Sequence, residues 1–103
     1  MSHTKTAQHT PGPWRAEFGE RAHGTSGALV RDRIGIVAEA YPRNPSGTEQ
    51  TANARLIAAA PDLLAALNAI LNDVDQDKAD GIETPDWAPA AYAAYAKATT
   101  GST

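Results

Sequence analysis

A chain of 103 residues holds one domain at most, because a core divided between two domains would leave each half too small to offset its conformational entropy. The formal net charge of −3 excludes the clustered excess of Lys and Arg that non-specific nucleic-acid binders and membrane-surface binders carry. The absence of cysteine excludes a disulfide framework and thiolate chemistry, and it suits a reducing cytoplasm.

Large side chains for a core are scarce. Hydrophobic residues make up 42% of the chain, but many of them are alanine and only 6% of all residues are aromatic. We therefore expect copies of the chain to associate as a homo-oligomer through helix faces, because association buries apolar surface that a small monomer cannot. No apolar run approaches the roughly 20 residues that span a bilayer, so we expect no contact with a membrane.

The first predicted element is a strand. The polar, aperiodic residues 1–10 are expected to form a flexible tail. In "WRAEF", Trp14, Ala16 and Phe18 alternate with charged residues, which is the period-2 pattern of a strand with one buried face. Residues 28–41, "ALVRDRIGIVAEAY", predict two further short strands. These segments indicate a small three-stranded antiparallel sheet.

A long helix is the strongest signal in the sequence. The segment "PRNPSG" at residues 42–47 ends the sheet, and Ser46 or Thr48 can cap the helix that follows. Apolar residues then recur at spacings of three and four over residues 53–74, as one stripe of a 3.6-period helix. Pro61 interrupts this stripe, which predicts two helices, or one kinked helix, joined at the proline.

The C-terminal part of the chain predicts a separate short helix. An acidic, turn-rich linker over residues 75–84 precedes it, and Trp87 and Tyr95 share one helical face at i and i+8. Residues 99–103 are expected to fray. Together the elements predict one α+β domain over residues 11–98, with a small three-stranded antiparallel sheet, a proline-jointed helix pair and a C-terminal helix.

Asn53 and Arg55 are the candidate ligand-binding residues. Asn53 falls inside the apolar stripe of the long helix, so its amide is expected to be at least partly buried and to need hydrogen-bond partners. Two interpretations stay open. The amide bonds a neighbouring backbone group, or it faces a cleft and, with Arg55 on the flank, recognises a polar ligand such as a phosphate or a carboxylate.

Trp87, Tyr92 and Tyr95 are the candidate partner-binding residues. With alanines between them they form an aromatic stripe on a slim helix. Such a stripe can pack on the sheet, pack against another subunit, stack on a base, or contact a partner protein. Trp14, by contrast, is expected to be a core residue because it alternates with other apolar side chains.

Neither a catalytic site nor a metal site is expected. The acidic series that begins at Asp73 has the alternate spacing of a calcium loop, but Lys78 and Thr84 stand where such a loop needs a glycine and a bidentate glutamate. The three histidines lack metal-ligand spacing, and no serine lies in a nucleophile elbow. We therefore expect no cofactor, no metal ion and no enzymatic activity.

Three segments together resemble a recurring type of small phage and prophage protein. They are "HTPGPW" at residues 9–14, "IGIVAEA" at residues 34–40 and "ANARLIAAAPDLLAAL" at residues 52–67. The resemblance covers about residues 9–72. It implies an accessory role for a phage, in the cytoplasm of the host cell.

Phage proteins of this size that are not structural often counter host defence by sequestration, so the resemblance implies a non-enzymatic anti-defence protein. One form is an inhibitor that binds a host immune effector, such as a CRISPR-Cas complex, for which Trp87, Tyr92 and Tyr95 are the candidate anchors. The acidic balance of the chain favours this form, because effector complexes are basic where they hold nucleic acid.

The alternative form is a homo-oligomeric sponge that sequesters a cyclic nucleotide or an ADP-ribose-type immune signal. Asn53 and Arg55 are then the candidates at a pocket between subunits. The order of strands before C-terminal helices is similar to that of the Thoeris anti-defence sponges, which is a likeness of fold alone. A phage regulatory or structural accessory role is the third alternative.

Overall fold

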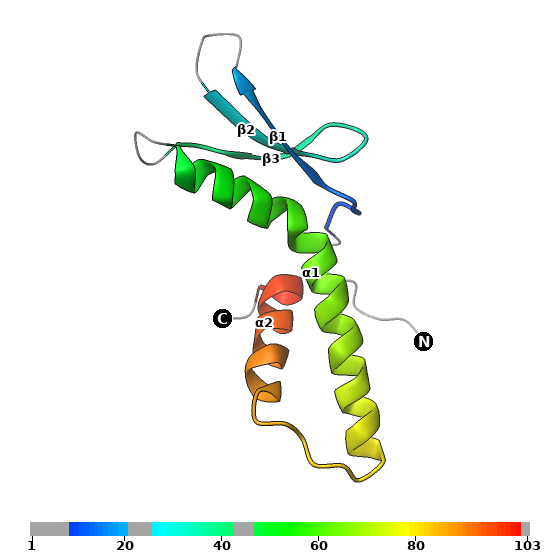
Figure 1. The fold of residues 1–103 in the computed structure, drawn as a ribbon. Helices are drawn as coiled ribbons and strands as arrows, with labels where there is room; N and C mark the ends of the chain where they lie inside the picture. The colour runs from blue at the N-terminus through cyan, green and yellow to red at the C-terminus, as the bar shows by residue number, and fades with distance from the viewer. Residues whose placement is uncertain (1–8, 21–25, 43–46, 102–103) are drawn as a thin grey trace. The chain divides into compact units, whose positions relative to one another are not determined.

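A computed structural model describes residues 9–20, 26–42 and 47–101 (Figure 1). The elements follow in chain order as β1 (Arg15–Glu20), β2 (Ser26–Arg31), β3 (Ile36–Ala40), α1 (Thr48–Ala79) and α2 (Ala88–Thr100). The three strands form one antiparallel sheet in the order β1-β2-β3. The predicted α+β fold, with a three-stranded antiparallel sheet followed by helices, is confirmed.

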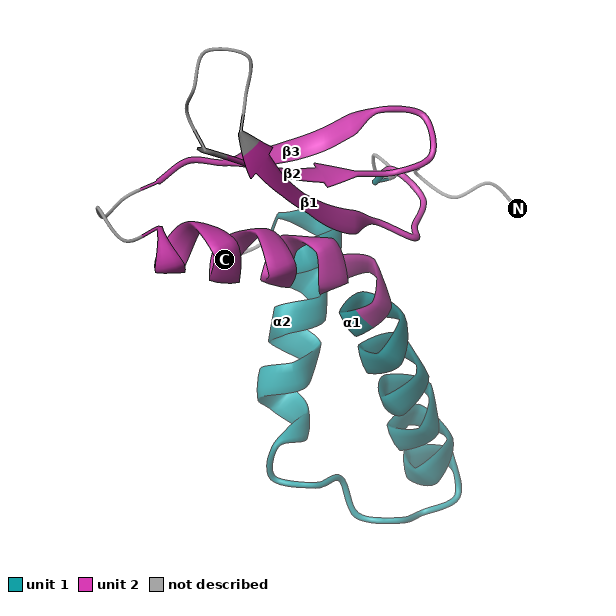
Figure 2. Ribbon diagram, turned by 45° about the horizontal axis from the view of Figure 1, so that its top comes forward, with its two compact units in different colours: residues 1–9, 63–103 teal, residues 10–62 magenta. Residues whose placement is uncertain are grey.

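The chain divides into two compact units (Figure 2). The sheet unit is Thr10–Asp62 and contains the three strands and the first half of α1. The helical unit contains Leu63–Thr103, which includes the second half of α1 and all of α2. The boundary lies directly beyond Pro61, the residue at which the sequence predicts a joint, although α1 is a single helix through this residue. The prediction of one folding domain over residues 11–98 stays a prediction.

The sheet follows the predicted alternation of its side chains. Ala16 lies opposite Val30 in the β1–β2 pair, and Val30 lies opposite Ala38 in the β2–β3 pair. These three side chains share one face because directly opposed residues of a sheet point the same way. One irregularity follows Val30, where the register shifts so that Arg31 lies opposite Ile36.

The core of the sheet unit is formed by this face and the first half of α1. Trp14 packs against the core as predicted, and its indole Nε1 donates a hydrogen bond to the carbonyl of Thr10 at 3.2 Å. Phe18, expected on the same buried face, is half exposed. The fully buried members are small, one valine and three alanines: Ala28, Val30, Ala40 and Ala54.

The face of α1 that meets the sheet differs from the predicted stripe. Gln50 and Ala54 are buried and Ile57 packs on the core, whereas Asn53 is exposed. The prediction that Asn53 is partly buried is therefore wrong. Spacing alone defines the predicted apolar stripe, but it does not determine which face of the helix packs on the sheet. The face that packs there is centred about one residue further along the helix.

Gln50 joins the start of α1 to the end of β3. Its buried side-chain Nε2 donates a hydrogen bond to the carbonyl oxygen of Ala40 at 2.9 Å. The helix begins at Thr48, and Gly47 before it has a φ of 72°. Ser46, the other predicted cap, lies outside the described residues.

The helical unit is an antiparallel helix pair. The second half of α1 and α2 lie side by side (Figures 1 and 2), and the Tyr92 hydroxyl on α2 donates a hydrogen bond to the Asp75 carboxylate on α1. Leu71, Val74 and Ala88 are the buried hydrophobic residues of the described part of this unit.

The end of α1 is a Schellman motif. Gly81 has a φ of 82°, its N–H donates to the carbonyl of Lys78 at 3.1 Å, and the N–H of Ile82 donates to the carbonyl of Asp77 at 2.8 Å. These two bonds satisfy carbonyl groups that the last helical turn leaves without intrahelical donors. Glycine is favoured at position 81 because it adopts a positive φ without a steric penalty.

The end of α2 is also capped. Gly101 has a φ of 77° and its N–H donates to the carbonyl of Lys97. The helix therefore continues to Thr100, beyond Ala98, where we predicted that the ordered chain would end. The threonine hydroxyls at its end donate to carbonyls one turn earlier: Thr99 to Tyr95 at 2.8 Å and Thr100 to Ala96 at 2.6 Å.

Candidate functional site

The connection between α1 and α2 presents two large apolar side chains to solvent. Trp87 is 50% exposed and directly precedes α2, and Ile82 is 54% exposed in the turn that ends α1. Three exposed carboxylates lie in the same short segment: Asp80, Glu83 and Asp86. We name this segment, residues 80–87, the acidic connection.

The helical unit carries the negative charge of the whole protein. Residues 63–101 contain six carboxylates and two lysines, which gives a balance of −4, whereas residues 10–62 contain six carboxylates and six arginines, which gives zero. Aromatic and apolar anchors surrounded by charge of one sign are suited to a partner of the opposite charge. The acidic connection therefore sets the exposed Trp87 and Ile82 among carboxylates of one sign.

Tyr92 and Tyr95 are placed differently from Trp87. Both tyrosines are half-buried, and they lie on the stripe of α2 that includes the buried Ala88. The Tyr92 hydroxyl bonds the Asp75 carboxylate, and this bond, the larger cause, together with desolvation raises the pKa of Tyr92 above its ordinary value. The predicted aromatic stripe thus divides into two half-buried tyrosines, of which Tyr92 bonds α1, and one exposed tryptophan. That the tyrosines also contact a partner stays a prediction.

Asn53 lines an open groove on the sheet unit. The groove has a volume of about 400 Å³, and its lining is almost entirely apolar. Asn53 is the one amide side chain of its lining, and the other lining residues come from the end of β3 and from α1: Ala40, Tyr41, Leu56 and Ile57. A groove of this kind offers one amide and no charged group to a ligand.

Arg55 does not line this groove. It stands over the ring of Phe18, with its guanidinium carbon 5.6 Å from the ring centroid, in a cation–π contact. Residues two apart on a helix do not face each other, so Asn53 and Arg55 act on different sides of α1. The two candidate ligand residues are not brought together in the sheet unit.

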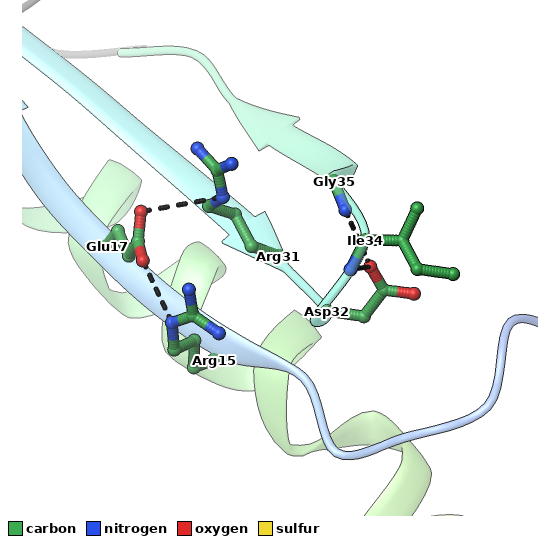
Figure 3. A network of polar contacts seen from close by, with 6 residues as sticks. All are labelled: Arg15, Glu17, Arg31, Asp32, Ile34 and Gly35. Atoms are coloured by element: carbon green, nitrogen blue, oxygen red, sulfur yellow. Dashed lines mark hydrogen bonds and ion pairs between the residues drawn. The ribbon is translucent and has the colours of Figure 1, made fainter.

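The face of the sheet that points away from α1 carries an ionic cluster (Figure 3). Glu17 accepts from Arg15 Nε at 2.8 Å and lies 3.7 Å from Arg31 Nε. The guanidinium of Arg31 is held close to the sheet, where its Nε is buried without a hydrogen-bond partner within 3.5 Å. The carboxylate neutralises much of the local positive charge, so this pair of arginines is not an open anion site.

Among the described residues, no group of three or more His, Asp or Glu side chains is arranged to hold a metal ion. Two carboxylates of the helical unit bond separate side chains and do not converge on one point. Asp75 accepts from the Tyr92 hydroxyl. Gln76 donates to Asp80 at 3.3 Å, which keeps a second carboxylate on the helix surface.

The helix α1 is also unusually long and apolar. By length and composition alone it is apolar enough to cross a bilayer, with a mean hydropathy of 1.5 over an 18-residue window. The premise that no apolar run has this length is therefore wrong. The first half of the helix packs on the sheet through the buried Ala54, and the absence of membrane contact stays a prediction.

Two local features of the site region were not predicted. Gln50, a polar residue buried between β3 and α1, gave no periodic signal because its burial depends on the Ala40 carbonyl ten residues earlier. The exposed Ile34 stands in the β2–β3 turn (Figure 3). The sequence predicts the break between these strands at residues 31–33 but places Ile34 in the strand that follows, whereas the N–H groups of Ile34 and Gly35 bond the Asp32 carboxylate and keep both residues in the turn.

Comparison with known protein families places the whole chain in a family of phage proteins. The family described as Salmonella phage P22 protein Y8K6 matches residues 1–103. No curated protein and no solved structure matches the chain.

Proposed function

The chain belongs to the family of Salmonella phage P22 protein Y8K6, and on that premise we propose that this phage accessory protein counters host defence without catalysis. It binds a host immune effector, such as a CRISPR-Cas complex, in the cytoplasm of the infected cell, and it needs no cofactor. The observation that carries the proposal is the exposed Trp87 within the acidic connection.

The chemistry of the acidic connection suits this task. Effector complexes that hold nucleic acid present basic surfaces, and carboxylates around an apolar anchor complement such surfaces. Trp87 supplies the large anchor, since tryptophan is enriched among the residues that dominate binding energy. Ile82 supplies a second apolar contact, and Tyr92 holds α2 in place through Asp75.

The test is a plating assay on hosts that carry a defined defence system. Expression of the wild-type protein is expected to raise the plating efficiency of a targeted phage by at least about tenfold, because loss of effector function removes the block. The double variant Trp87→Ala/Ile82→Ser is expected to lose this effect, since truncating anchor residues of an interface costs about 2 kcal/mol or more each.

Ile36→Ser is the matched control for the isoleucine change. Ile36 is 57% exposed, close to the 54% of Ile82, but it lies in the sheet unit. This variant is expected to keep full activity. Equal plating with wild-type protein and with empty vector, on hosts that carry each major class of nucleic-acid-targeting defence, would contradict the proposal.

A binding assay checks the electrostatic part of the proposal. The affinity for the purified effector is expected to fall as salt is raised from 50 to 300 mM, because salt screens exposed charge pairs. An affinity that does not change with salt would show that the acidic residues are not part of the contact.

The sponge alternative has weaker geometric support. Asn53 lies in an apolar groove and Arg55 lies over Phe18, so the two polar groups do not converge on one ligand. Titration of the purified protein with cyclic nucleotides and with ADP-ribose tests it directly. A heat of binding that disappears in Asn53→Ala would favour the sponge over the inhibitor.

A further inference from the structure

We propose that copies of this chain assemble head to tail through the sheet unit, with the β2–β3 turn of one copy seated in the groove of the next. Ile34 is the apolar residue that enters, and the groove beside Tyr41 receives it. The inference is independent of the acidic connection, because every residue that it uses lies in Thr10–Asp62.

The turn is a rigid support for an exposed apolar side chain (Figure 3). The Asp32 carboxylate accepts the N–H of Ile34 at 2.8 Å and of Gly35 at 2.9 Å. The N–H of Asp32 in turn donates to the Gly35 carbonyl at 3.1 Å. Ile34 itself is 84% exposed, the largest exposed fraction among the large hydrophobic residues described. A fixed turn loses little conformational entropy when it binds, which favours its use as a docking element.

The groove is matched to an aliphatic side chain. Its volume of about 400 Å³ is open to solvent, and its walls include the exposed side chains of Tyr41 and Leu56. Removing apolar area from water favours association. Seating Ile34 there covers three large apolar groups at once, and none of the residues that line the groove, Asn53 included, carries a charge that must be desolvated.

The charges next to the turn and the groove are complementary, and they favour a second copy as the occupant. Arg33 is exposed beside Ile34 on the turn. At the groove, the Tyr41 hydroxyl donates to the Glu39 carboxylate at 3.5 Å, which places an acidic group beside the wall residue Tyr41. A docked copy brings its arginine together with its isoleucine, so an apolar contact and an ion pair form in the same event.

The net charge of the sheet unit permits this assembly. Residues 10–62 contain six acidic and six basic residues, so two such units have no net repulsion. The small core of the unit, with Val30 as its largest fully buried side chain, adds a reason for association. Copies that cover each other's apolar groups stabilise a fold that has few large residues inside.

The positions of turn and groove determine the kind of assembly. Ile34 precedes β3 and Tyr41 follows it, and seven residues of extended chain span roughly 20 Å. A copy therefore cannot fill its own groove with its own turn. A contact between two different patches is heterologous, and it produces a closed ring or an open chain of copies.

Cysteine cross-linking tests the contact directly, because the chain has no cysteine of its own. Tagged Ile34→Cys protein is mixed with untagged Tyr41→Cys protein under mild oxidation. The tagged–untagged disulfide is expected to form about tenfold faster than in a mixture of Ile82→Cys with Tyr41→Cys, because docking raises the effective concentration of the two thiols. Ile82 is the matched control since it is also an exposed isoleucine.

A charge-exchange series tests the ion pair in the same assembly. Arg33→Glu and Glu39→Arg are each expected to weaken self-association by about tenfold in sedimentation experiments, and the double variant is expected to recover most of it. Circular dichroism of each variant verifies that the sheet is retained.

Two results would overturn the proposal. One is a cross-linking rate for the Ile34→Cys and Tyr41→Cys pair that equals the control rate. The other is a monomeric wild-type protein at concentrations up to about 1 mM, where even an interface of −4 kcal/mol is half occupied. The plating assay for host defence is read separately on Trp87 variants, so failure of one proposal is distinguishable from failure of the other.

Discussion

Gly12 lies against Pro61, so closely that a Cβ at position 12 would stand 3.0 Å from the Cβ of the proline. The two residues belong to two of the segments that carry the resemblance to phage proteins, "HTPGPW" and "ANARLIAAAPDLLAAL". Their contact seats the chain that precedes β1 on α1 within the sheet unit. A side chain at residue 12 would therefore force Pro61 to shift by a few tenths of an ångström.

The first prediction concerns this contact. Gly12→Ala is expected to destabilise the sheet unit by about 1–3 kcal/mol, because inserting a methyl group into a packed contact forces its neighbours to shift. Urea denaturation followed by Trp14 fluorescence measures it, in a Trp87→Phe background so that one tryptophan reports on the sheet unit. Gly19→Ala is the control, because a Cβ at residue 19 meets nothing within 4 Å. Equal shifts of the two midpoints would contradict the packing argument.

The second prediction concerns the end of α1. Gly81→Ala is expected to lower stability by about 1 kcal/mol, because Gly81 has a φ of 82° and alanine is strained there. A Cβ at this position meets no atom within 4 Å, so the cost comes from the backbone alone. Gly81→Asn is expected to cost less, since asparagine tolerates the left-handed region better than alanine. Thermal melting followed by circular dichroism at 222 nm compares the two variants. A higher melting temperature for Gly81→Ala than for Gly81→Asn would argue against this explanation.

The third prediction concerns the buried amide of Gln50. Gln50→Ala removes the donor to the Ala40 carbonyl and is expected to cost about 1–3 kcal/mol, because a buried acceptor is left unsatisfied. Glu49→Gln, at the exposed neighbouring residue, is the control and is expected to change stability by at most about 1 kcal/mol through the helix dipole. The same urea titration with Trp14 fluorescence measures both. If Gln50→Ala lowers stability less than Glu49→Gln does, the hydrogen bond to Ala40 is not the cause of the stabilisation.

The fourth prediction concerns pH. Because the pKa of Tyr92 in the folded protein is raised above its ordinary value of 10.0, the bond to Asp75 contributes stability fully below pH 10 and loses it as pH rises through the folded-state pKa. Tyr92→Phe is therefore expected to be less stable than wild type at pH 8, with the difference shrinking as the pH is raised above 10. Denaturation at a series of pH values measures this. Tyr95→Phe removes the same atom from the same helix, and an identical pH profile for both variants would rule out the specific role of Tyr92.

Local patterns in the sequence were sufficient for the elements and for part of the core. The alternation around Trp14 and Ala16 predicted β1, because a strand places successive side chains on opposite faces whatever it pairs with. The three-and-four spacing predicted α1, and the family resemblance was read from contiguous segments. Trp87 is among the predicted partner-binding residues for a local reason too, because it belongs to the aromatic stripe of the C-terminal helix.

The position of each functional group relative to the others was decided only by tertiary structure. Asn53 was predicted on the buried side of α1, yet packing on the sheet placed Gln50 and Ala54 there and left Asn53 on the groove. A helical repeat determines which residues share a face but does not determine which face is covered. The contact of Arg55 with Phe18 on β1 likewise depends on how α1 packs on the sheet.

By itself, the sequence determined that this protein has three strands, a helical segment with a joint at Pro61, a short C-terminal helix and an acidic C-terminal part, while it left open whether the segment is one helix or two. These features follow from periodicity, turn residues and charge, each of which can be recognised in a short segment of the sequence. Tertiary structure alone decided that Gly12 meets Pro61, that Tyr92 bonds Asp75, and that Tyr41 borders a groove. Such contacts join residues far apart in the chain, and they form only where the summed burial of apolar area offsets the entropy of bringing the segments together.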